Sequence, residues 1–557
     1  MVGIRANTIK LYLSIWISFF FLYASSLEAN NNLDFRENAS TLIMNSLKEQ
    51  EKDSFLYTLY AAFFFMPLWV QAEKPSSLAQ TLFKQIQEDQ TLALHSKLKQ
   101  DAYALADSLK VLYGSESSLL SKVELEFKIS QLYKGYADYA LYGSINWDAF
   151  QKRLHSLKSK DIHASWLTYK PKISPLILLK NAVVSSNLEN IFKDVKPKSY
   201  HYDMLYDALI KYIKLEKIGG WENITLGKTL RKGDSHKAIA LLRKRLRISG
   251  DYKYCDASQE FFYDSCLKEA VIGFQKRHGL ISKGVIGKKT VAALNIPIEI
   301  RIRQMRLNLD RIKWLYAYNE ERHIIINIPS FMLFFERNKL LQQQMKVIVG
   351  KKRNPTPIFS NRVKTIVLNP YWNIPKSIIQ KEMIPELIKN PEAMEEQGIE
   401  IRAGWGKDAG IVDAYSFDWS QYRYSQSMPF RFAQVPGRKN ALGKVKFLFP
   451  NQFAVYMHDT PNKKLFKRNV RAFSHGCIRL ARPRDLLETF STFNDAVDFE
   501  TSKEKLKGRK RSNLKLNQQV PIDIVYLTAY VDYAGILQFR NDIYGYDRMQ
   551  LQAYRKW

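Results

Sequence analysis

The chain has 557 residues, of which 46% are hydrophobic and 13% aromatic, and it carries a formal net charge of +31. This apolar content excludes a disordered chain, and the length predicts several domains at roughly 150 residues each. So large a positive charge is typical of proteins that meet anionic polymers or lipid head groups, and ordinary solubility explains it equally well.

The first segment, residues 1–29, has the layout of a secretory signal. Arg5 and Lys10 precede an apolar run at 11–23, and small residues follow, which predicts export and cleavage. A retained segment would instead serve as an inner-membrane anchor. The expected location is therefore the periplasm. The anionic partners expected there are the cell wall and the lipid head groups at the periphery of the membrane. Export argues against a nucleic-acid partner.

Residues 30–222 are expected to form an all-helical scaffold region. Their apolar side chains recur at helical spacing, as at 78–87 and 202–218. Residues 223–298 then read as a compact module of three short helices, with apolar periodic runs at 230–246 and 261–295.

The three cysteines fall into two groups. Cys255 and Cys266 are eleven residues apart in one segment and would be able to form a local disulfide. Cys477 is then the odd thiol. An unpaired cysteine in an oxidising compartment indicates either reactivity or an inert buried side chain.

Residues 299–557 change to a strand-like pattern rich in Ile, Val, Phe and Tyr. An insertion at about 374–438 opens with a helical stretch at 374–389 and is expected to be a functional lid. The basic run 503–515 reads as a solvated loop between a helix and a strand. The predicted fold class is multidomain α+β with a mostly-β C-terminal domain. The predicted strands are 323–336, 344–350, 364–372, 444–450, 453–458 and 522–532.

The stretch AFSHGCIRL, residues 472–480, contains the candidate nucleophile Cys477. A predicted strand ends at His458, and 482–490 reads as a helix, so Cys477 is expected in the loop that enters this helix. The positive end of the helix and a cation such as Arg479 would stabilise a thiolate there.

A cysteine nucleophile needs a base within hydrogen-bond reach, and His458 or His475 would serve. His458 has the better position because it lies at a rigid strand end. His475, between Ser474 and Gly476, is better suited to shaping the loop. The backbone amides of this loop would face a developing oxyanion.

Other interpretations of the same residues stay open. Cys477 would also fit a buried structural thiol. A zinc site built from His458, His475 and Cys477 is a rival, but the three residues lack the usual metal-ligand spacing, so no metal and no cofactor are expected. Arg479 would hold a substrate carboxylate or pair with Asp485, and the two-pronged grip of a guanidinium favours the carboxylate.

The order His458, fifteen residues, Ser474, His475, Gly476, Cys477 and then Arg479 resembles the signature of the L,D-transpeptidase catalytic domain of the YkuD type. The resemblance implies transfer of a peptidoglycan stem tetrapeptide. Cys477 would attack the carbonyl of the third residue and expel the terminal D-alanine, with His458 as base.

The same resemblance implies roles for the neighbouring residues. The main-chain carbonyl of Asp459 would orient the imidazole. His475, Gly476 and Cys477 would form the oxyanion wall.

Further motifs resemble the multidomain YcbB-like branch of this family, among them NPYWNIP at 369–375 and HDTP at 458–461. In that branch Trp372 and Tyr456 would line the site, although core packing explains these two aromatics equally well. The lid would cap the substrate. The three-helix segment is similar to a type 1 peptidoglycan-binding module, except that Lys283 stands where an acidic residue is common.

The predicted function is an exported L,D-transpeptidase that forms 3-3 cross-links in peptidoglycan, with stem peptides and other cell-wall synthesis proteins as partners. The alternative is an L,D-carboxypeptidase or endopeptidase that uses water as acceptor. A hypothesis of another class is a non-catalytic wall-binding scaffold, against which the intact pair Cys477 and His458 argues.

Overall fold

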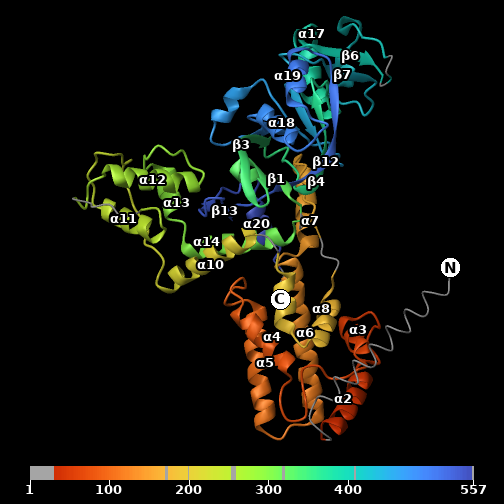
Figure 1. The fold of residues 1–557 in the computed structure, drawn as a ribbon, viewed down its shortest axis with the longest axis vertical. Coiled ribbons are helices and arrows are strands. Elements are labelled where there is room, and N and C mark those ends of the chain that lie inside the picture. The colour runs from red at the N-terminus through yellow and green to blue at the C-terminus, as the bar shows by residue number, and fades with distance from the viewer. Residues whose placement is uncertain are drawn as a thin grey trace, which may run out of the picture. The chain divides into compact units, whose positions relative to one another are not determined.

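The computed structural model of the chain divides into two compact units (Figure 1). Among the described residues, the first unit holds 31–143 and 173–196, and the second holds 144–169 and 197–554. The predicted signal at 1–29 lies outside the described residues. Within the described part of the chain, no helix combines the length and apolarity that a bilayer crossing requires. The structure describes residues 31–169, 173–197, 200–252, 259–315, 320–404, 406 and 409–554.

The first unit is helical, as predicted. Helix α4 illustrates why: Ser76 caps its first turn by accepting from the Ala79 amide, and its apolar positions, Leu82 and Ile86 among them, are buried on one face. The helices of this unit are α2 (Asn31–Leu47), α3 (Phe55–Ala62), α4 (Ser77–Glu88), α5 (Lys97–Gly114), α6 (Leu119–Tyr142), α8 (Pro175–Ser185) and α9 (Leu188–Val195).

A buried carboxylate organises the centre of this unit. Glu126 of α6 is fully buried, and its two oxygens accept hydrogen bonds from the Leu68, Trp69 and Val70 amides at 2.6–2.9 Å and from the Tyr60 hydroxyl at 2.8 Å. Burial outweighs these donors and raises the pKa of Glu126 to about 7. The carboxylate thereby fixes an irregular segment that helix hydrogen bonds do not reach.

The second unit begins with a helical frame. It contains α7 (Trp147–Ser156), α10 (Tyr200–Lys217), α14 (Ile298–Lys313) and the predicted three short helices α11 (Ala238–Ile248), α12 (Ser265–Arg277) and α13 (Lys288–Leu294). Asp264 caps α12 by accepting from the Leu267 amide. Cys255 lies outside the described residues, so its pairing with Cys266 stays a prediction.

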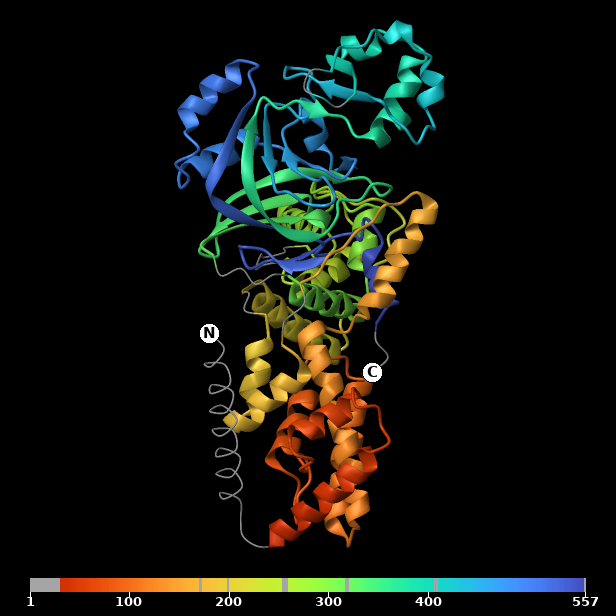
Figure 2. The ribbon, with the colours of Figure 1, turned by 90° about the vertical axis from the view of Figure 1, so that its right-hand side faces the viewer.

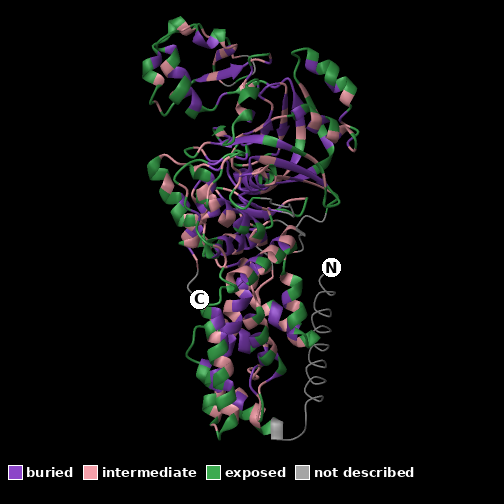
Figure 3. Ribbon diagram, turned by 90° about the vertical axis from the view of Figure 1, so that its left-hand side faces the viewer, coloured by how far each residue is buried: buried purple, intermediate pink, exposed green. Residues whose placement is uncertain are grey.

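The strands of the second unit form a closed barrel. The sheet order is β10-β3-β11-β9-β8-β4-β12-β1-β2, and a further pairing of β2 with β3 closes it, which leaves only β10 outside the ring. Apolar side chains of alternate residues fill the interior, so burial concentrates along these strands (Figure 3). The strands are β1 (Arg322–Asn327), β2 (Met332–Arg337), β3 (Leu340–Gly350), β4 (Phe359–Leu368), β8 (Val445–Leu448), β9 (Met457–His458), β10 (Ala472–Ser474), β11 (Ile478–Leu480) and β12 (Ser512–Val525).

Remaining elements support the barrel from outside. They are the helices α18 (Pro483–Ser491), α19 (Phe499–Lys507) and α20 (Tyr546–Leu551), and the hairpin of β13 (Ala529–Val531) with β14 (Leu537–Phe539). The prediction of one solvated loop over 503–515 is wrong at both ends, because α19 continues to Lys507 and β12 starts at Ser512.

The insertion forms a lobe with its own core beside the barrel (Figure 2). Its small sheet, in the order β5-β7-β6, packs on short helical turns. Its elements are β5 (Trp372–Asn373), α15 (Lys376–Ile378), the π-helical turn η3 (Ile379–Met383), α16 (Ile384–Leu387), α17 (Ala393–Glu396), β6 (Ile399–Ala403) and β7 (Phe430–Gln434). We call this lobe the lid.

Four of the predicted strand segments have wrong bounds. The segment 323–336 contains two strands, β1 and β2, and 522–532 is divided between β12 and β13. The predicted strand 364–372 ends at Leu368, and Trp372 belongs to the sheet of the lid instead. Of 453–458 only Met457 and His458 pair as a strand. The Asn440 side chain joins the two segments that connect the lid to the barrel. Its amide donates hydrogen bonds to the Pro370 carbonyl and to the Gln434 carbonyl, each at 3.1 Å.

Candidate active site

Four of the predicted site residues lie on the outer face of the barrel, namely Tyr456, His458, Cys477 and Arg479. Strand β9 pairs with β11, with His458 opposite Arg479, and with β8, with His458 opposite Lys446. Opposite residues in paired strands share a face, and so do residues two apart. Tyr456, which precedes β9, and Cys477, which precedes β11, continue the same face. Their neighbours Met457 and Ile478 instead point into the core.

His458 is buried, with 4% of its surface exposed. Its Nδ1 is 2.5 Å from the Asp459 carbonyl oxygen, which can only accept, so the proton is on Nδ1 and Nε2 carries the lone pair. This is the contact that the resemblance implies for Asp459. Burial first, and the charge of Arg479 second, lower the pKa of His458 to about 3. The ring is therefore neutral at physiological pH.

Asp459 is itself held in place from three sides. Its carboxylate accepts from the amides of Lys444 at 2.9 Å and Thr460 at 2.7 Å and from the Lys463 ammonium at 2.6 Å. Gly443 packs against it: a Cβ on this residue would lie 2.4–2.5 Å from the Asp459 side chain, and its φ of +60° also favours glycine. The orientation of His458 thus depends on a close approach that only glycine allows.

Cys477 is a free, half-buried thiol. Burial raises its pKa, although the Tyr456 amide and hydroxyl hydrogen-bond the sulfur and the charges of Lys446 and Arg479 oppose the shift. The expected thiolate support from a helix start is wrong, because strand β11 separates Cys477 from α18. At rest, therefore, both Cys477 and His458 are uncharged.

The loop that carries Cys477 is held by internal hydrogen bonds. The Ser474 hydroxyl donates to the Cys477 carbonyl at 2.5 Å and accepts from the Gly476 amide at 3.2 Å. The Thr356 hydroxyl donates to the Gly476 carbonyl at 2.8 Å. Because the Gly476 amide is engaged with Ser474, the amides of His475 and Cys477 are the candidate donors for an oxyanion.

The aromatic residues expected at the site are brought to Cys477. The Trp372 indole donates to the Tyr456 hydroxyl, which in turn hydrogen-bonds the Cys477 sulfur. Sequence reasoning missed Lys446, whose ammonium lies 3.6 Å from the centre of the Tyr456 ring and whose pKa burial lowers to about 8. Lys446 gives no local signal, since only the pairing of β8 with β9 brings it here.

Arg479 has a vacant hydrogen-bond donor. Its Nε is buried and has no partner among the described residues. The alternative of an Arg479–Asp485 pair is wrong, because Asp485 pairs with Arg482 at 3.3 Å. A half-buried guanidinium with an unused donor beside a thiol is suited to binding a carboxylate.

His475 points away from this face toward the lid. Its Nε2 lies 2.7 Å from Glu382 of η3 and 3.1 Å from the Lys351 ammonium. Among the described residues, no three His, Cys, Asp or Glu side chains gather into a group that would hold a metal.

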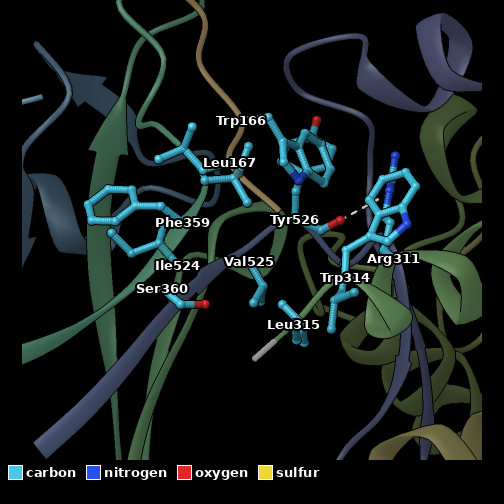
Figure 4. A pocket seen from close by; sticks show the side chains of 12 residues that line it. Trp166, Leu167, Arg311, Trp314, Leu315, Phe359, Ser360, Ile524, Val525 and Tyr526 are labelled. Atoms are coloured by element: carbon cyan, nitrogen blue, oxygen red, sulfur yellow. Dashed lines mark hydrogen bonds between the residues drawn. The ribbon is translucent and has the colours of Figure 1, made fainter. Parts of the chain in front are cut away.

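A separate pocket lies where residues 166–167 cross the barrel beside Trp314 and Tyr526 (Figure 4). Aromatic and aliphatic core side chains dominate its lining, and Arg311 at its edge donates to the Tyr526 carbonyl at 3.0 Å. None of the predicted site residues lines it, so this pocket is a packing feature and not the candidate site.

Comparison with known families agrees with this geometry. Residues 321–499 match the family described as "L,D-transpeptidase catalytic domain", YkuD. Residues 54–209 match a "Scaffold domain", and residues 235–294 match a "Putative peptidoglycan binding domain".

Individual relatives cover parts of the chain. A "Putative L,D-transpeptidase" of Haemophilus influenzae is 31% identical over 256 residues, which span 46% of this chain and half the length of that relative. The solved L,D-transpeptidase from Stackebrandtia nassauensis is 12% identical, with a TM-score of 0.21, over 53% of this chain and 94% of that one. The one from Mycobacterium smegmatis is 12% identical, with a TM-score of 0.18, over 37% and 58%.

The motif around Cys477, the paired strands and the family match agree with one another. Residues 321–499 belong to the L,D-transpeptidase catalytic domain family, within a multidomain chain that also carries a scaffold domain and a peptidoglycan binding domain.

Proposed function

We propose that this protein is an exported, periplasmic L,D-transpeptidase that forms 3-3 cross-links in peptidoglycan through an acyl-enzyme on Cys477. The observation that carries the proposal is the face shared by Cys477, His458 and Arg479, with the His458 ring oriented by Asp459 and a donor of Arg479 vacant. This arrangement supplies a nucleophile, a base and a carboxylate anchor.

In the first step the Cys477 sulfur attacks the carbonyl carbon of the third stem residue. The carbon–sulfur bond forms, the bond to the D-alanine nitrogen breaks, and the thiol proton passes through His458 Nε2 to the departing amine. Because the pKa of His458 is low and that of Cys477 is raised, a separated ion pair is costly before substrate binds. Proton transfer is therefore expected to accompany the attack of sulfur on carbon.

Substrate itself would improve the base. The charge of Arg479 is the second cause of the low pKa of His458. A stem carboxylate bound to Arg479 would neutralise that charge and raise the proton affinity of the imidazole. The base would thus become effective when the donor peptide is in place.

In the second step the amine of an acceptor stem attacks the thioester carbon and loses its proton to His458. The carbon–sulfur bond breaks, and the proton returns to sulfur. The alternative function, L,D-carboxypeptidase or endopeptidase, differs only in that water replaces the amine. The lid favours transfer, because a capped site restricts bulk water while a bound second stem is held close to the thioester.

Purified mature protein incubated with disaccharide tetrapeptide tests the proposal. We expect D-alanine release and cross-linked dimer by mass spectrometry, and loss of both in Cys477→Ala with retained binding to sacculi. Tripeptide as the sole product would favour the hydrolase. Undiminished turnover by the alanine variant would refute the thiol mechanism, and inhibition by a chelator would favour a zinc site.

A further inference from the structure

Two adjacent lid residues of opposite charge reach two different anchors on the body of the second unit. The Lys381 ammonium binds both carboxylate oxygens of Asp161 at 3.0 and 3.2 Å. Glu382 Oε1 lies 2.7 Å from His475 Nε2, two residues before Cys477. One contact therefore holds the lid to the body, and the other joins it to the loop of the nucleophile.

Both residues lie on the π-helical turn η3. Such a turn interrupts an α-helix with one extra residue, and it is frequent at functional sites. Consecutive residues on a helical turn point in different directions around its axis, so Lys381 and Glu382 diverge toward separate partners. The two contacts can therefore be removed one at a time.

His475 Nε2 lies between two groups with opposite demands. A carboxylate only accepts hydrogen bonds, and an ammonium only donates them. Glu382 lies 2.7 Å from Nε2, so Nε2 carries the ring proton and donates it to the carboxylate. Without Glu382, the ring proton would move to Nδ1. The bare Nε2 would then accept a hydrogen bond from the Lys351 ammonium, which lies 3.1 Å away. The presence of the lid thus selects the tautomer of His475.

The other charges around this ring agree with a neutral imidazole. Burial, Lys351 and Arg479 lower the pKa of His475, and Glu382 opposes them. The His475 side chain is 32% exposed, so water competes with the contact when the lid moves away.

We propose that Glu382 is a positioning residue that couples lid closure to acylation, by holding His475 with its proton on Nε2 and thereby ordering the Ser474–Cys477 loop. This inference rests on the proposed function. It makes the lid more than a cover: Cys477 reaches full reactivity toward a stem peptide only while Glu382 contacts the loop.

Three variants of the full-length mature protein separate this role from lid attachment. Glu382→Ala removes the acceptor, Glu382→Gln restores a neutral acceptor oxygen, and Lys381→Ala releases the other anchor without touching His475. The readouts are the rate of D-alanine release from tetrapeptide and the ¹⁵N-histidine NMR signature of His475, assigned with His475→Gln.

We expect Glu382→Ala to slow D-alanine release about three- to tenfold and to move the His475 proton to Nδ1. Glu382→Gln should recover part of the rate, and Lys381→Ala should change the rate about twofold or less with the tautomer kept. Equal effects of the two alanine variants, or an unchanged tautomer in Glu382→Ala, would overturn the inference. Wild-type protein that releases no D-alanine would instead refute the proposed function.

Discussion

Replacing Gly443 by alanine should disable His458 from a distance. The new Cβ would lie 2.4–2.5 Å from the Asp459 side chain, so Asp459 must retreat by roughly 1 Å to reach ordinary contact. That movement breaks its hydrogen bonds with Lys444 and Thr460 and shifts the carbonyl that accepts from His458 Nδ1. The backbone conformation at φ +60° adds about 1 kcal/mol of strain.

The magnitude follows from these contributions. Two hydrogen bonds to a carboxylate, each worth about 1–2 kcal/mol, together with the strain give a destabilisation of about 3–5 kcal/mol. A base displaced by about 1 Å is expected to lower kcat/KM about 100-fold. Thermal unfolding and D-alanine release measure the two effects in the same preparation.

Two controls identify the cause. Gly535 also has a positive φ, +74°, so Gly535→Ala places alanine in a similarly strained backbone conformation. No atom lies within 4 Å of its new Cβ. This variant should therefore lose stability and keep activity. The double variant Gly443→Ala with Asp459→Gly should be no less active than Asp459→Gly alone, because every Asp459 side-chain atom that the new Cβ overlaps, its own Cβ included, is then absent. Wild-type kcat/KM in Gly443→Ala would refute the proposed chain of positioning from Gly443 to His458.

Three further predictions follow from the titratable groups. Because burial raises the pKa of Cys477, its alkylation by iodoacetamide should have a pH midpoint above that of an ordinary cysteine. The Lys446→Met variant should have a still higher midpoint, because the Lys446 charge lowers the pKa of the thiol. A midpoint near neutral pH in the wild-type protein would contradict the raised pKa. In Arg479→Met the pKa of His458 should rise from about 3, as measured by NMR titration, and the KM for stem peptide should rise with it; an unchanged pKa would exclude the coupling. The pKa of Glu126 is about 7 in the folded protein and 4.5 in the unfolded chain. Its contribution to the free energy of unfolding is therefore complete in acid and is lost as the pH rises from 4.5 through 7. The total loss is about 3 kcal/mol. Hydrogen exchange of the α6 amides at pH 5 and 8 measures that loss, and Glu126→Gln, which has no charge, should remove the pH dependence.

Much of this protein was predictable from local pattern. Helical periodicity identified the helical region, as at 78–87, and the three short helices that precede the barrel. The spacing of His458 and Cys477 identified the candidate catalytic pair, because a strand end and a loop near one another in sequence need little chain to meet. Such signals survive in a sequence because they depend on neighbouring residues.

Boundaries were less predictable where tertiary pairing overrides propensity. The strand-like run 453–458 pairs only at Met457 and His458, and Trp372 leaves the barrel for the lid. Cys477 precedes a strand that is too short to give a periodic signal. Partners across the sheet decide these ends, and a single chain segment does not reveal its partners.

The sequence by itself determined the fold class and pointed to the candidate nucleophile and its candidate base, since each rests on residue type and short spacing. The tertiary structure alone brought Lys446 opposite His458, placed Gly443 against Asp459 and set Glu382 on His475. Those contacts join residues from separate strands and from the lid. Their positions follow from strand register and from how the lid packs on the barrel, which no local pattern encodes.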